Sequence, residues 1–180
     1  MKKINLALLA SLVLVSPWAA ADLSYTNFSV GYIDGDIRSA DIDGFDLRGS
    51  ISINSDIFLL ANYSALDSNG VDIDLLRFGA GYRTALTEDI DFVTTFSILD
   101  FDNGNNSSDG YQLTGGIRGK ANREIEYSAE LVKEDIDDFD DDIGIEVGAR
   151  YFFTRENSVG VSLRDVNNID TFRISVRFDF

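Results

Sequence analysis

Hydrophobic and polar residues alternate along most of the chain, from Asn27 to the final Phe180. Phe28, Val30 and Tyr32 alternate with small or polar residues, and the same period of two returns in nine later segments. Successive side chains of a β-strand point to opposite faces, so this period predicts strands with one apolar and one polar face. The ten expected strands cover residues 27–32, 45–54, 59–65, 76–83, 91–98, 111–118, 125–131, 145–151, 159–164 and 172–180.

The segments between these strands also alternate in character. Four are short and of mixed polarity, and five are mostly acidic and contain turn-forming Gly, Asn and Ser. The short connections are 54–56, 84–89, 121–124 and 154–157, and the acidic ones are 34–44, 67–72, 102–109, 135–142 and 167–168. The pattern predicts an all-β fold, an up-and-down antiparallel barrel of ten strands in which closure leaves no unpaired edge, with eight strands as the alternative.

A period of two does not by itself decide which face of the barrel points outward. Two observations favour a transmembrane β-barrel with its apolar face in lipid. Glycines share the polar face with arginines, and we expect them to make room for arginine inside a narrow barrel. These glycines are Gly31, Gly79, Gly81, Gly116, Gly148 and Gly160. Aromatic residues of the apolar face fall near both strand ends, as two interfacial girdles would.

The polar face carries both signs of charge in comparable number. Because buried charge must be paired, we expect these side chains to form ion pairs in the lumen, where a purely structural role is the favoured interpretation. Barrels of ~8 strands are filled by side chains and ~16 are needed for an aqueous channel, so ten strands leave at most a tight, charged path. The predicted lumen network consists of Arg48, Arg77, Arg83, Arg118, Arg150, Arg164, Arg173, Arg177, Asp46, Asp91, Glu126, Glu130, Glu146 and Asp179.

The first 21 residues have the features of a secretory signal peptide. Lys2 and Lys3 precede an apolar run that is too short to span a bilayer, and Ala19 to Ala21 form a small-residue cleavage site. We therefore expect residues 1–21 to be a signal peptide and residues 22–180 to be one barrel domain that begins at Asp22.

Composition narrows the function further. The chain has 180 residues and a net charge of −16, and removal of Lys2 and Lys3 with the leader makes the charge −18, which argues against a nucleic-acid partner. It contains neither Cys nor His, so disulfides, a cysteine nucleophile, the most usual general base and the most frequent metal ligand are all missing. We expect no enzymatic activity and no cofactor.

An acidic run near residue 140 raises the possibility of calcium binding, since hard cations prefer clustered carboxylates. Its weak candidate ligands are Asp137, Asp138, Asp140, Asp141 and Asp142. An EF-hand loop starting at Asp138 would need Gly where Ile143 stands and Glu where Ala149 stands. The favoured interpretation is a solvated outer loop without a dedicated metal site.

Short motifs along the mature chain resemble those of a known family. They are Leu23-Ser24-Tyr25, Gly31-Tyr32, Asp43-Gly44-Phe45, Leu47-Arg48-Gly49-Ser50, Gly70-Val71-Asp72-Ile73-Asp74, Arg77-Phe78-Gly79-Ala80-Gly81-Tyr82 and Asp109-Gly110-Tyr111. This pattern resembles small bacterial outer-membrane barrels of the sulfation-dependent quorum factor family, within the wider OmpA-like and porin-like superfamily. The resemblance implies no catalytic residues, and Tyr25 is expected to be an interfacial anchor.

The chain also ends in a way that resembles the assembly signal of outer-membrane barrels. Apolar residues occupy every second position up to the last one, at Phe172, Ile174, Val176, Phe178 and Phe180. These observations together favour an outer-membrane barrel with a structural or surface-interaction role, whose partners are membrane lipid, lipopolysaccharide, the assembly machinery and divalent cations at the acidic loops. A narrow solute or ion pore is the alternative, and a vesicle-released signal, suggested only by the family name, is a lesser one.

Overall fold

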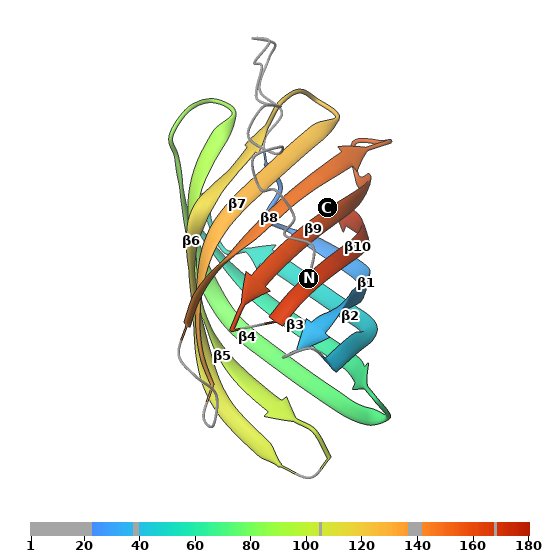
Figure 1. Cartoon of the computed structure of the whole chain (residues 1–180). Helices are drawn as coiled ribbons and strands as arrows, with labels where there is room; N and C mark the ends of the chain where they lie inside the picture. Colours follow the sequence, from blue (N-terminus) through green and yellow to red (C-terminus); the bar gives the residue numbers. More distant parts are fainter. Residues whose placement is uncertain (1–22, 38–39, 105, 137–141, 168) are drawn as a thin grey trace.

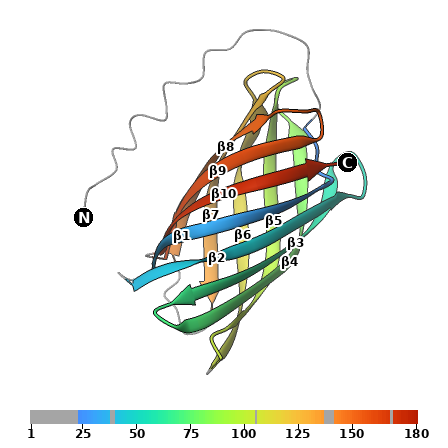
Figure 2. The same cartoon turned by 90° about the vertical axis from the view of Figure 1, so that its right-hand side faces the viewer.

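In a computed structural model, the chain forms a closed antiparallel barrel of ten strands (Figure 1). The structure describes residues 23–37, 40–104, 106–136, 142–167 and 169–180. Each strand pairs with its neighbours in sequence, and β1 (Asn27–Ile37) pairs with β10 (Ile169–Asp179) to close the cylinder. The strands run obliquely around the barrel, as the view turned by 90° also shows (Figure 2). The predicted up-and-down barrel of ten strands is confirmed, and the alternative with eight strands is wrong.

The other strands are long for a chain of this size. They are β2 (Ala40–Ser52), β3 (Ile57–Ser68), β4 (Val71–Ala85), β5 (Ile90–Asp102), β6 (Ser107–Lys120), β7 (Ile125–Ile136), β8 (Asp142–Phe152) and β9 (Asn157–Val166). None of the residues in the described ranges forms a helix that is long and apolar enough to cross a bilayer.

Four connections at one end of the barrel are built in the same way. In the turn between β2 and β3, Ile53 N donates to Ile57 O at 2.8 Å, and Asn54 Oδ1 accepts the amides of Asp56 and Ile57, both at 2.8 Å. The turns at 86–90, 121–125 and 153–157 repeat this backbone bond. Each has Asn or Thr in its second position, whose side-chain oxygen accepts an amide from within the turn. These short polar side chains therefore define the turns locally.

The outer face of the barrel carries a continuous apolar band. Its large side chains are between a third and two thirds exposed in β1, β4 and β5, for example Tyr32 at 37%, Phe78 at 53% and Ile98 at 59%. In β10 the band runs from Phe172 to Phe180, which is about 20 Å along the barrel axis at ~3.3 Å per residue and a tilt of about 40°. The band is thus close to the ~25 Å of apolar surface found in membrane barrels.

Beyond this band the polarity of the two faces is exchanged. In β1 the outward residues change from Val30 and Tyr32 to Asp34 and Asp36, while Ile33 turns inward with 8% exposure. Seven other strands, namely β2 to β6, β9 and β10, also carry exposed aspartates at this level, and together they form an acidic collar on the outside. The collar consists of Asp34, Asp36, Asp41, Asp43, Asp67, Asp72, Asp74, Asp100, Asp102, Asp109, Asp165 and Asp170, which are all exposed.

Two of the expected acidic loops, 34–44 and 67–72, are therefore mostly strand. Residues 34–37 belong to β1 and residues 40–44 to β2, and only two residues separate these strands. The expected loop at 67–72 is likewise reduced to a tight turn, in which Asn69 and Gly70 have positive φ angles of 54° and 82°. The alternation continues through these acidic stretches with its faces exchanged, which is why their composition resembles that of loops.

Candidate functional site

The lumen is filled by charged side chains that project from eight of the strands. β2 supplies Asp46 and Arg48, β4 supplies Arg77 and Arg83, and β5 supplies Asp91. The remaining members of the predicted network lie on later strands: Arg118 on β6, Glu126 and Glu130 on β7, Glu146 and Arg150 on β8, Arg164 on β9, and Arg173, Arg177 and Asp179 on β10. The structure arranges most of them in three groups, each around one buried carboxylate.

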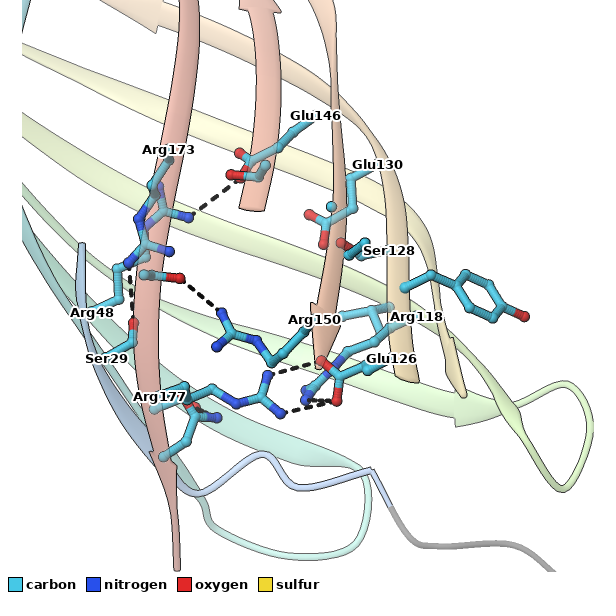
Figure 3. A pocket seen from close by; sticks show the side chains of 18 of the residues that line it. Ser29, Arg48, Arg118, Glu126, Ser128, Glu130, Glu146, Arg150, Arg173 and Arg177 are labelled. Carbon is cyan, nitrogen blue, oxygen red and sulfur yellow. Dashed lines mark hydrogen bonds and ion pairs between the residues drawn. The ribbon is translucent and has the colours of Figure 1, made fainter. Parts of the chain in front are cut away.

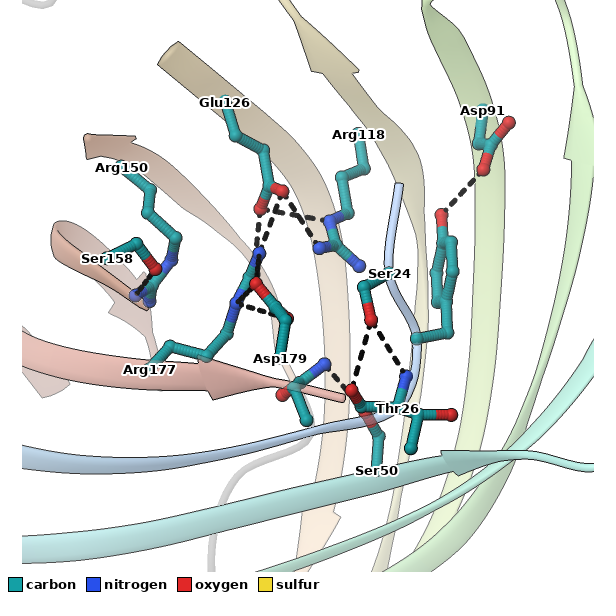
Figure 4. A network of polar contacts seen from close by, with 12 residues as sticks. Ser24, Thr26, Ser50, Asp91, Arg118, Glu126, Arg150, Ser158, Arg177 and Asp179 are labelled. Carbon is teal, nitrogen blue, oxygen red and sulfur yellow. Dashed lines mark hydrogen bonds and ion pairs between the residues drawn. The ribbon is translucent and has the colours of Figure 1, made fainter. Parts of the chain in front are cut away.

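The first group surrounds Glu126, which is 5% exposed. Arg118 Nε and Nη2 donate to its two carboxylate oxygens at 3.0 and 2.9 Å, and Arg177 Nη1 and Nη2 do so at 2.8 and 2.9 Å. Arg177 Nε also lies 3.1 Å from Asp179 Oδ1. Figures 3 and 4 show both guanidinium groups converging on this one carboxylate. Bidentate arginine contacts on both sides give Glu126 strong, directional hydrogen bonds.

The second group surrounds Asp46, which is fully buried. Arg48 Nε lies 2.7 Å from Asp46 Oδ2, and Arg173 Nε lies 2.8 Å from Oδ1. Arg48 Nη1 also reaches Glu146 Oε1 at 3.4 Å, and Arg173 Nη2 donates to Ser29 Oγ at 3.2 Å. This group connects β1, β2, β8 and β10 across the lumen (Figure 3).

Gly31 on β1 allows the second group to pack this closely. A Cβ atom at Gly31 would overlap Asp46 Oδ1 and Arg173 Nε, whereas a Cβ atom at Gly115 on β6 would meet no atom within 4 Å. We expect Gly31→Ala to lower the free energy of unfolding by about 1–3 kcal/mol through overpacking. Urea titration of the folded protein in lipid vesicles measures this, with Gly115→Ala as the matched control. Equal stability of the two variants would contradict the close packing of Asp46 and Arg173 against Gly31.

The third group surrounds Glu134 on β7, a residue that the predicted network does not contain. Glu134 is 2% exposed, and it accepts Arg77 Nη2 at 3.1 Å, Arg164 Nη2 at 2.7 Å and Gln112 Nε2 at 3.0 Å. Glu134 lies between the end of the expected strand at residue 131 and the expected acidic connection that begins at residue 135. The missed signal is the period of two that begins at Glu126 and continues through Glu130 to Glu134, past the expected end of the strand.

Arg150 and Glu130 lie outside these three groups. Among the described residues, Arg150 donates to the hydroxyls of Ser158 at 3.2 Å and Ser175 at 3.0 Å in place of a carboxylate. Both Arg150 and Glu130 line a cavity of about 270 Å³ that lies toward the short turns. Arg150 is therefore a lumen cation whose hydrogen bonds go to neutral groups (Figure 3).

The N-terminal segment before β1 occupies the lumen near the short turns. Tyr25 is 4% exposed, its Oη donates to Asp91 Oδ2 at 2.9 Å, and its ring packs on Phe58 with centroids 4.9 Å apart. The guanidinium carbons of Arg83 and Arg118 lie 4.5 and 4.6 Å from the ring centroid. Burial raises the pKa of the Tyr25 phenol above its ordinary value, so the hydroxyl stays protonated as a donor.

The expectation that Tyr25 is an interfacial anchor is therefore wrong. The tyrosine and Leu23, which is 7% exposed, form a small apolar cluster with Phe58 and Val93 inside the barrel. Figure 4 shows the N-terminal segment at Ser24 and Thr26 beside the wall that carries Arg118. Cation–π contacts with Arg83 and Arg118 stabilise the Tyr25 ring inside the lumen.

Six glycines of the polar face were expected to make room for arginine side chains, and the structure confirms this at two of them. A Cβ atom would meet Arg173 at Gly31 and Arg150 at Gly160. At Gly79 and Gly116 the space is occupied chiefly by the backbone of the neighbouring strand, and the remaining two glycines face Phe58 and serine side chains. Close approach of a neighbouring backbone therefore explains Gly79 and Gly116, whereas Gly81 and Gly148 make room for side chains other than arginine.

The weak metal candidates have no described site. Asp137, Asp138, Asp140 and Asp141 lie outside the described residues, and Asp142 is the first residue of β8. Within the described ranges, no three acidic side chains converge in a way that could hold a metal ion.

Comparisons with known proteins identify the fold class. No protein-family model matches the chain, and no curated protein matches it. Among solved structures, the chain is similar to the KdgM porin, with a TM-score of 0.53 and 16% identity over 84% of this chain and 99% of that chain. A structure of the KdgM porin in complex with disordered oligogalacturonate gives a TM-score of 0.52 and 14% identity over the same shares. The chain therefore shares the closed β-barrel fold of these porins. The resemblance to the sulfation-dependent quorum factor family gains no support from the comparisons.

Proposed function

We propose that this protein is an integral β-barrel of the bacterial outer membrane with a structural or surface-interaction role. The single observation that carries the proposal is the apolar band on the outside of a barrel whose lumen is filled with ion pairs. A large apolar outer surface is unfavourable in water, whereas contact with apolar lipid chains is favourable. The apolar run and small residues at 1–21 agree with export by a signal peptide.

Membrane fractionation and gel migration test this proposal together. We expect the full chain, expressed in a Gram-negative host, to be found in the outer-membrane fraction. We also expect its migration on a detergent gel to change after boiling, because a closed barrel resists detergent until it is heated. Recovery as a water-soluble monomer whose migration does not change on boiling would overturn the proposal.

The acidic collar supports a surface role toward the lipopolysaccharide headgroups. It lies directly beyond the apolar band, where Tyr32 Oη donates to Asp43 Oδ2 at 2.9 Å and Tyr63 Oη donates to Asp74 Oδ1 at 2.5 Å. In this position, divalent cations would bridge collar carboxylates and headgroup phosphates. The exposed apolar residues of β10 from Phe172 to Phe178, followed by Phe180, are the proposed recognition element for the assembly machinery.

Repulsion within the collar makes cation dependence measurable. Asp36 stands directly opposite Asp41 and Asp170, and Asp67 stands opposite Asp43 and Asp72. Like charges in such positions destabilise a sheet by about 0.2–1 kcal/mol a pair. We expect millimolar Mg²⁺ to raise the urea concentration at which half of the wild-type protein is unfolded. The double variant Asp36→Asn with Asp67→Asn should have a higher midpoint than the wild type in the absence of Mg²⁺, and its midpoint should rise less when Mg²⁺ is added. An unchanged Mg²⁺ response in the double variant would count against a cation-binding collar.

A narrow pore that prefers anions is the second candidate function. Two cavities of about 270 Å³ each occupy the lumen, and both are lined by Arg48, Glu146, Ser162 and Arg173. The 3.4 Å contact between Arg48 and Glu146 lies where the two cavities share their lining, so a path between them would pass this pair. Arg150 would present positive charge to a passing anion, since its hydrogen bonds go to serine hydroxyls.

Planar-bilayer recordings separate the two candidates. If the barrel conducts, we expect wild-type protein to show small steps with a reversal potential that favours Cl⁻ over K⁺. Arg150→Ala should shift the reversal potential toward cation selectivity, because it removes the positive charge of Arg150 from the lumen. Arg155→Ala, in an exposed turn outside the lumen, is the matched control. Absence of steps in folded wild-type protein would eliminate the pore and leave the structural role.

A further inference from the structure

The lumen near the collar contains an apolar chamber. Its walls are built by isoleucines that turn inward where the faces of the strands exchange polarity, among them Ile33 on β1, Ile42 on β2, Ile73 on β4 and Ile136 on β7. Each of these four side chains is less than a tenth exposed. Polar and charged side chains of the Glu134 and Asp46 groups line the rest of the chamber. The chamber is thus amphipathic, with an apolar wall and a charged part.

The charged part carries an excess of cations. Arg48, Arg77, Arg164 and Arg173 line the chamber together with Glu134 and Glu146. Even with the fully buried Asp46 counted as a partner of Arg48 and Arg173, four guanidinium groups face three carboxylates. An anionic group is therefore favoured here, because it neutralises the remaining positive charge.

One of these guanidinium groups has an unused hydrogen-bond donor. Arg77 is 8% exposed, its Nη1 donates to Asn62 Oδ1 at 3.2 Å and its Nη2 donates to Glu134 Oε1 at 3.1 Å. Its Nε is buried and has no partner. Asn167, also at the chamber, has a buried Oδ1 without a partner. Protein atoms cover both orphaned atoms, so the excess of cations, and not these two atoms, is what favours an anionic ligand.

We propose that this chamber binds an alkanoate, with its carboxylate at Arg77 and its hydrocarbon chain between the inward isoleucines. The carboxylate lies against the guanidinium groups of the charged part, and the hydrocarbon chain covers the apolar wall. The volume of about 270 Å³ is about nine times the ~30 Å³ of one molecule in liquid water. A methylene group is of similar size, so the chamber accommodates a chain of roughly eight to ten carbon atoms.

Methyl NMR of the full-length mature barrel in lipid nanodiscs tests this proposal with sodium decanoate as the probe. We expect saturable shifts of the isoleucine methyls at positions 33, 42, 73 and 136. The methyls of Ile98 and Ile174 face the lipid and report decanoate that merely partitions into the bilayer. In the wild-type protein, 1-decanol should bind at least tenfold more weakly, because it has the same chain but no charge for the guanidinium groups.

Two variants locate the ligand within the chamber. Ala40→Phe fills the chamber from β2 and should raise the decanoate concentration at half-saturation at least tenfold, whereas Ala65→Phe adds the same bulk on the exposed outer face and should leave it unchanged. Arg77→Met should weaken decanoate about tenfold without weakening 1-decanol. Heat-modifiable migration confirms that each variant is folded. The proposal is overturned by non-saturable shifts, by equal binding of decanoate and 1-decanol to the wild-type protein, or by unchanged binding in folded Ala40→Phe.

Discussion

Replacement of Glu126 by glutamine is expected to lower the free energy of unfolding by about 3–5 kcal/mol. The substitution keeps the shape of the side chain but removes the charge that Arg118 and Arg177 share at 2.8 to 3.0 Å. Arg118 then loses its carboxylate partner and Arg177 keeps only Asp179. The cost of burying an incompletely paired charge exceeds the gain from the pair itself. Urea unfolding in phospholipid vesicles, followed by far-UV circular dichroism, measures the change.

The matched control for this variant is Glu156→Gln. Glu156 is exposed in the turn between β8 and β9, so loss of its charge should change the free energy of unfolding by less than ~0.5 kcal/mol. A Glu126→Gln variant as stable as Glu156→Gln would mean that the buried carboxylate does not hold the arginines in the folded lumen.

Replacement of Phe78 by arginine on the opposite face is expected to cost about 2–4 kcal/mol when the barrel is embedded in a bilayer. Phe78 lies within the apolar band on β4, between Leu76 and Tyr82, and it is 53% exposed. Transfer of a charged side chain into hydrocarbon is unfavourable, whereas the same side chain on a water-exposed surface costs nothing comparable. The measurement is the unfolding free energy in vesicles of stated lipid composition.

Leu86→Arg separates the effect of lipid from that of charge alone. Leu86 is 58% exposed, but it lies in the turn between β4 and β5, beyond the end of the strand. We expect its substitution to be nearly neutral. If Phe78→Arg were as mild as Leu86→Arg, the apolar band would not face the interior of a bilayer, and the assignment to the outer membrane would fail.

The alternation of polarity was sufficient to predict the strands of the barrel, because it depends only on the local geometry of the chain. From Phe28 to Tyr32 and from Phe172 to Phe180 the expected and observed strands coincide closely. The ends of the strands near the collar could not be predicted in the same way. There Asp34 and Asp36 are as suitable for a loop as for a strand whose outer face is in water.

The candidate site was less predictable because it depends on contacts between distant residues. Glu134 belongs to the same alternation as Glu126, but only the closed barrel brings it to Arg77 and Arg164. Tyr25 precedes the first strand, and nothing in its neighbours indicates that it turns inward to meet Asp91, 66 residues away. Tertiary contacts of this kind are set by how the cylinder closes, which local patterns do not encode.

The pairing of Asn27 with Asp179 joins residues about 150 positions apart and seals the cylinder. Contacts over such a sequence separation form slowly, because the chain between them must first be ordered. Until that moment the first and last strands each present an open hydrogen-bonding edge, which is a template for another chain. Faithful biogenesis therefore depends on keeping two unfinished copies apart during this interval, since strands exchanged between them would give an interlocked dimer instead of a sealed monomer.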